Sequence, residues 1–68
     1  MKNIFKTVYL DGDRILCGTS QGEVYEFNLN TRQFSLFYQT TDRRPIYHIS
    51  RSRAGEVIIG AISVTEGL

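Results

Sequence analysis

The chain has 68 residues, of which 41% are hydrophobic and 22% are charged, and its formal net charge is +1. This ordinary globular composition excludes a disordered segment and a strongly basic nucleic-acid-binding domain, and the length allows a single domain with a small core. No apolar stretch approaches the roughly 20 residues of a membrane span, the N-terminus does not resemble a signal peptide, and the single cysteine permits no intrachain disulfide. We therefore expect a cytoplasmic protein.

Turn-forming residues divide the chain into short segments, beginning with the turns at 11–13 and 20–22. The segments between the turns are rich in Val, Ile, Tyr, Phe and Thr, which favour strands, and none has the length of a good helix. An all-β chain is therefore predicted, with strands at 5–10, 14–19, 23–29, 33–39, 46–50 and 56–62.

The predicted strands are of two kinds. Segments 15–17 and 57–59 are continuous apolar runs, which are typical of strands that are covered on both faces. Segment 23–29 alternates instead, which places Tyr25, Phe27 and Leu29 on one face. We expect the apolar runs to be interior strands and the alternating strand to have one face in contact with water.

The two apolar runs belong to a pair of similar hexapeptides. RILCGT at 14–19 and EVIIGA at 56–61 share the order charged, three apolar, glycine, small, and Gly18 and Gly60 lie 42 residues apart. A period of about 40 to 45 residues with four strands per unit is typical of a β-propeller blade. The stretches ILCGTSQGEVYEFNLNTRQF and IYHISRSRAGEVIIGAISVTEGL resemble the blades of WD40-like and two-component-regulator-type β-propellers, in which a Gly-Thr pair ends the second strand. The Trp-Asp and Gly-His pairs of WD40 blades are absent from the sequence.

This resemblance implies a partial β-propeller of short antiparallel strands. Residues 1–68 then form a single all-β unit, with one four-stranded blade over 5–39 and the first half of a second blade over 46–68, and the aromatic side chains pack in the core or between blades. Because a propeller needs at least about four blades, we expect a fragment or subunit that a protein partner or further copies of the chain complete, not a free monomer. The alternative fold is a small closed barrel of the Sm-like or SH3-like kind, with segment 22–37 as a bent hairpin.

No catalytic or cofactor-binding constellation can be assembled from these residues. Asp11 and Asp13 flank a glycine in a hairpin turn, and no further acids follow at the spacing of a calcium loop. Cys17 and His48 are too few ligands for a structural zinc site, and the apolar surroundings of Cys17 disfavour a thiolate. Glu26 is expected to be solvated. We therefore predict no enzyme activity, no cofactor and no metal.

The segment DRRPIYHISRSR at 42–53 has a local net charge of +3. The planar guanidinium group of arginine can bind carboxylate or phosphate groups through two hydrogen bonds. In a blade, however, the arginine pair at 43–44 and the pair at 51 and 53 would lie on opposite rims. The predicted function is a protein-interaction or scaffolding module, and the alternative is a small barrel that binds the phosphates of nucleic acid through these four arginines. The candidate partner-binding residues are Arg43, Arg44, Tyr47, Arg51 and Arg53.

Overall fold

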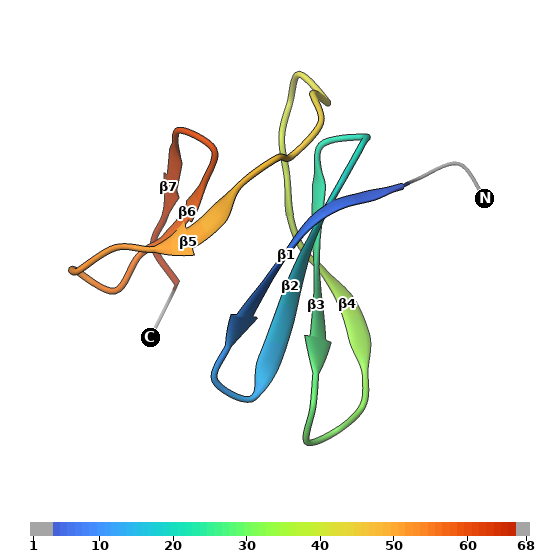
Figure 1. Ribbon diagram of the computed structural model, residues 1–68, viewed down its shortest axis with the longest axis vertical. Coiled ribbons are helices and arrows are strands. Elements are labelled where there is room, and N and C mark those ends of the chain that lie inside the picture. Colours follow the sequence, from blue (N-terminus) through green and yellow to red (C-terminus); the bar gives the residue numbers. More distant parts are fainter. Residues whose placement is uncertain (1–3, 67–68) are drawn as a thin grey trace.

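The computed structural model describes residues 4–66, which form seven strands and no helix (Figure 1). The all-β fold predicted from the sequence is therefore confirmed. The first four strands pair in sequence order as one antiparallel sheet, which coincides with the unit predicted over 5–39. These strands are β1 (Phe5–Asp11), β2 (Arg14–Thr19), β3 (Glu23–Asn28) and β4 (Phe34–Gln39).

Short polar turns connect these four strands. In the β1–β2 turn Gly12 has a φ of 65°, a left-handed conformation that glycine adopts without steric cost. Between β3 and β4 the side-chain oxygen of Asn28 accepts hydrogen bonds from the backbone N–H groups of Asn30 (2.9 Å) and Thr31 (3.0 Å). Because an Asn side chain satisfies nearby backbone donors in this way, the sequence Asn-Leu-Asn-Thr forms a turn here and ends β3.

The second sheet is formed by β5 (Ile49–Arg51), β6 (Val57–Ile59) and β7 (Ile62–Val64), again antiparallel and in sequence order. The prediction of one strand over 56–62 is wrong, because Gly60 has a φ of 60° and reverses the chain there together with Ala61. The strand predicted at 46–50 begins only at Ile49, because the N–H of Ile46 donates instead to the carbonyl oxygen of Thr19 (2.9 Å).

The two sheets are separate, and the strands of residues 4–66 close no barrel. The Sm-like or SH3-like alternative is therefore wrong. The unit predicted over 46–68 corresponds to the second sheet as far as residue 66, and residues 67–68 lie outside the described residues. In the described part of the chain there is also no helix long and apolar enough to cross a bilayer.

The hydrophobic core lies between the two sheets. Leu16 and Val24 of the first sheet and Ile49, Val57 and Ile59 of the second are all buried and form one cluster. Leu16 and Val24 lie on the same side of the β1–β4 sheet, which we call its inner face. β2 and β6 each have a paired strand on either side, and each buries one face more fully than the other, since Ile15 and Ile58 are only partly buried.

Gly18 marks the point where the connection between the sheets crosses the inner face. A Cβ atom at this position would lie 2.5 Å from Cγ2 of Ile46 and 2.9 Å from Cγ2 of Thr7, so only glycine fits without a shift. Gly60, which holds the corresponding position in the hexapeptide EVIIGA, is not packed in this way. Gly60 is exposed in the β6–β7 turn, and a Cβ there would meet open space.

Candidate interaction surface

The face of the β1–β4 sheet that points away from the second sheet is here called the outer face. The strand registers place one side chain from each strand in each row across the sheet. The outer face has three such rows, and nine of its twelve residues are apolar or aromatic. The rows are Val8, Cys17, Tyr25 and Leu36; Leu10, Ile15, Phe27 and Phe34; and, at one end, Phe5, Thr19, Glu23 and Gln39.

Much of the outer face is open to water. The second sheet packs on the inner face, and five residues of the outer face are at least half exposed. Monomeric soluble proteins rarely expose contiguous apolar patches larger than a few hundred Å². The half-exposed residues are Phe5 (50%), Val8 (64%), Leu10 (69%), Phe34 (51%) and Leu36 (51%).

An aromatic cluster forms one side of the outer face, with Phe34 at its centre. The Phe34 ring stacks on Tyr25 with 5.2 Å between ring centroids, and it meets Phe27 at 6.1 Å and Phe5 at 6.3 Å in tilted geometry. These residues meet because Phe27 and Phe34 are direct cross-strand partners. Aromatic pairs at such distances stabilise one another.

Cys17 lies in the middle of the outer face but is itself buried. Burial raises the pKa of its thiol, which keeps it protonated and poorly nucleophilic at neutral pH. His48 is exposed in the segment before β5. Residues 4–66 bring together no group of three or more His, Cys, Asp or Glu side chains that could hold a metal ion.

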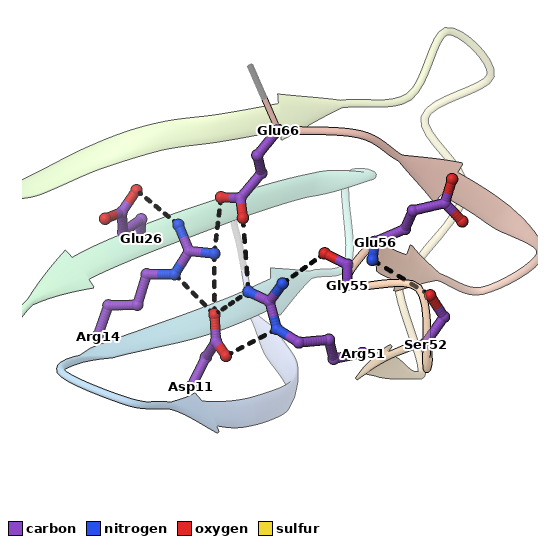
Figure 2. Close-up of polar contacts among 8 residues, drawn as sticks. All are labelled: Asp11, Arg14, Glu26, Arg51, Ser52, Gly55, Glu56 and Glu66. Atoms are coloured by element: carbon purple, nitrogen blue, oxygen red, sulfur yellow. Dashed lines mark hydrogen bonds and ion pairs between the residues drawn. The ribbon is translucent and has the colours of Figure 1, made fainter. Parts of the chain in front are cut away.

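A cluster of ion pairs connects the two sheets on the inner side, as Figure 2 shows. Arg51 of β5 makes two hydrogen bonds with the Asp11 carboxylate, from Nη2 to Oδ2 (2.6 Å) and from Nε to Oδ1 (3.1 Å). Arg14 of β2 contacts Oδ2 of Asp11 (2.8 Å) and Oε2 of Glu66, which follows β7 (2.7 Å). Each arginine thus bonds to a carboxylate of the other sheet. The cluster, which we call the ion-pair clamp, holds the sheets in one relative position.

Three side chains of the ion-pair clamp have shifted pKa values. Hydrogen bonds from Arg51 lower the pKa of Asp11 below its ordinary value of 3.8, and the Arg14 contacts add to this against the opposing effect of burial. The same bonds to Asp11 raise the pKa of Arg51. Burial opposes the charge of Arg14, but its hydrogen bonds to Glu66 and Asp11 outweigh that effect and raise its pKa. All three groups stay charged at neutral pH. Ion pairs that hold two sheets together need such permanent charges, whereas an acid–base pair has to exchange a proton.

The sequence analysis did not recognise the clamp. Asp11 was assigned to a turn only, and Glu26 was expected to be solvated, whereas its side chain is 24% exposed and lies 3.7 Å from Nη1 of Arg14. The Arg14 guanidinium also lies 5.2 Å from the centroid of the Phe37 ring. The one signal in the sequence was a charged residue, Arg14, directly next to a buried apolar run.

The five predicted partner-binding residues are not gathered at one place. Arg51 is bound in the clamp and also donates from Nη1 to the carbonyl oxygen of Gly55 (2.6 Å). The other four are exposed. Figure 1 shows the 42–45 loop at the top of the molecule and the β5–β6 turn at its left side. The exposed residues are Arg43, Arg44, Tyr47 and Arg53. The Nε atom of Arg44 lies 3.5 Å from Oδ2 of Asp42.

A cleft of about 360 Å³ lies between the connecting segment and the β6–β7 turn. Its apolar wall is formed by Ile46, Ile59 and Ile62, and Asp42 and Arg44 also line it. Ile59 belongs to the core, so the cleft opens from the core toward the β7 end of the second sheet.

No protein-family model matches the chain, and no curated protein or solved structure is significantly similar to it.

Proposed function

We propose that this chain is a protein-interaction module that stacks the outer face of its β1–β4 sheet on another β-sheet, as a segment of a propeller-like assembly. The observation that supports the proposal is the outer face itself: nine of its twelve residues are apolar or aromatic, and five of these nine are at least half exposed. At about 25 cal/mol per Å² of apolar surface, covering such a face stabilises an assembly substantially.

The packing inside the chain indicates what kind of partner fits. The row Ile49, Ile59 and Ile62 crosses β5, β6 and β7 just as Val8, Cys17 and Tyr25 cross β1, β2 and β3. The next row of each sheet corresponds in the same way, because Val57 of β6 holds the position that Ile15 holds in β2. The second sheet therefore uses the positions of an outer face to pack on the inner face of the first sheet.

This correspondence supports a head-to-tail stack of sheets. In such a stack, the outer face of the β1–β4 sheet packs on the inner face of a further sheet, as the β5–β7 sheet does within the chain. One difference is informative: Arg51 of the second sheet occupies the position of Leu10 in the first. The sheet that covers the outer face therefore needs an apolar contact opposite Leu10, where the internal interface has the ion-pair clamp.

A pair of matched lysine variants tests the proposal. Leu10 and Tyr47 are both 69% exposed, but only Leu10 belongs to the outer face. In a solution of the purified chain the only sheet that can cover the outer face is that of a second copy. We expect the wild type to self-associate in sedimentation equilibrium, and we expect Leu10→Lys to weaken the association at least about tenfold.

The Tyr47→Lys variant is the control, and it should associate as the wild type does. A wild-type chain that stays monomeric at all concentrations, or equal weakening by both lysine substitutions, would contradict the proposal. Equal weakening would instead favour the loop residues near Tyr47 as the contact. Circular dichroism of both variants checks that the strands are retained.

A further inference from the structure

We infer that the outer edge of β7 is a second binding site, which accepts one extended strand of a partner protein by antiparallel pairing. The site is separate from the outer face, and the inference does not rest on the proposed function. The first observation is the strand correspondence between the sheets. β7 occupies the place of β3, and β3 pairs with β4, whereas within the described residues no strand pairs with the free side of β7.

The backbone of β7 presents hydrogen-bonding groups to this side. The N–H of Gly60 donates to the carbonyl oxygen of His48 (2.9 Å), so Ile49 and Ile59 form a non-hydrogen-bonded pair. The N–H and C=O of Ile59 therefore point toward Ile62 of β7. Because these directions alternate along a strand, the N–H and C=O of Ser63 point away from β6, toward the free edge.

Two features that keep strand edges apart, charge and proline, are also missing from this three-residue edge. The sequence Ile62-Ser63-Val64 has no charged residue and no proline, and its register with β6 is regular. The Ser63 hydroxyl is bonded to Oε1 of Glu56 (2.7 Å), which leaves the backbone edge uncovered by that side chain. An uncharged, regular edge with free backbone groups favours strand addition.

The cleft indicates what side chains the added strand needs. In the first sheet, Leu36 of β4 lies opposite Tyr25, and the corresponding position in the second sheet lies opposite Ile62. Ile62 lines the cleft together with Ile46 and Ile59, so an apolar side chain opposite Ile62 enters it. The partner strand therefore has the pattern of β4: two apolar residues separated by one small polar residue, as in Phe34-Ser35-Leu36.

The probe is a synthetic peptide with the sequence QFSLFYQ of residues 33–39, titrated into the Leu10→Lys chain so that the outer face is disabled. We expect its binding to shift the amide resonances of residues 62–64 and to slow hydrogen exchange at Ser63. A peptide with N-methylated serine should bind more weakly, because it cannot donate the central backbone hydrogen bond.

Two variants at one position separate backbone from side chain. Ser63→Ala removes the hydroxyl and keeps the amide, and it should bind the peptide as tightly as its parent. Ser63→Pro removes only an N–H that β6 does not use, and it should bind about tenfold more weakly, the effect of one lost backbone hydrogen bond. If the proline variant does not fold, the inference is tested by the hydrogen-exchange rate of the Ser63 amide in the parent chain, which should fall when the peptide binds.

Three outcomes would overturn the inference. The first is a set of shifts confined to the outer face, and the second is unchanged exchange at Ser63 when the peptide is saturating. The third is self-association of the Leu10→Lys chain that Ser63→Pro abolishes, because the edge would then be occupied by a second copy and not by a partner protein.

Discussion

Gly18 is the residue of β2 against which the connecting segment between the two sheets packs. The nearest atoms to a Cβ at this position are Cγ2 and Cβ of Ile46, at 2.5 Å and 2.7 Å, and Ile46 is itself buried and bonded through its N–H to Thr19. Neither atom belongs to the far end of a flexible side chain. We therefore expect Gly18→Val to lower the free energy of unfolding by about 3 kcal/mol or more, at the upper end of overpacking effects.

The matched control for Gly18 is Gly60→Ala. Its Cβ meets open space, but a φ of 60° strains any residue with a side chain, so a loss of about 1 kcal/mol is expected. Urea unfolding of both variants measures the difference. Similar losses in the two variants would show that Ile46 moves away from β2 at little cost, contrary to the packing described above.

At the scale of elements, the ion-pair clamp links β1 and β2 to β5 and to the segment after β7. Because Asp11 has a lowered pKa in the folded protein, the unfolded chain takes up this proton at a higher pH than the folded one. The contribution of Asp11 to stability is therefore fully present above its ordinary pKa of 3.8 and is lost as the pH falls through the lower, folded value. We expect Asp11→Asn to be less stable than wild type at neutral pH. Its free energy of unfolding should also fall less steeply than that of the wild type as the pH is lowered.

The control for the clamp is Asp42→Asn. The Asp42 side chain is 59% exposed and pairs with Arg44, whose side chain is 84% exposed, and surface pairs of this kind contribute about 1 kcal/mol at most. Thermal unfolding between pH 2 and pH 7 compares the variants. If Asp11→Asn kept the acid dependence of the wild type, the clamp would not couple the sheets.

The strands of the first sheet could be predicted closely because each is bounded by turn residues that act locally. The Gly12 turn and the Asn28 side chain illustrate this, since their effects depend on residues within a few positions. The second sheet was predicted less well. The run from Val57 to Ile62 has no polar residue that would indicate a turn. Only the left-handed backbone conformation of Gly60 separates β6 from β7.

The candidate surface could be predicted only in part, because it depends on how the two sheets pack together. Alternation in the sequence placed Tyr25 and Phe27 on one strand face, but it could not say which face the second sheet would cover. Asp11 and Arg51 are 40 residues apart, and they meet only because one sheet packs on the other. Contacts that depend on tertiary packing leave no local pattern in the sequence.

At the scale of the whole molecule, the two sheets share one core. The described residues span 30 × 27 × 18 Å, and the buried apolar cluster lies between the two sheets that Figure 1 shows. Neither sheet has a separate cluster of buried side chains, because Leu16 and Val24 are covered by residues from Ile46 onward. The β1–β4 sheet and the β5–β7 sheet should therefore unfold together.

An Ile59→Ala substitution tests this coupling. Ile59 is 1% exposed in the second sheet, and its truncation should lower the free energy of unfolding by about 2–5 kcal/mol. If the core is shared, amide exchange at Leu16 and Val24 in the first sheet should accelerate by the same factor as exchange at Val57. Leu29→Ala, at a residue 41% exposed and outside the cluster, should change neither rate appreciably. Faster exchange confined to β5–β7 would mean that the first sheet is stable without the second, and that its inner face does not depend on the contact described here.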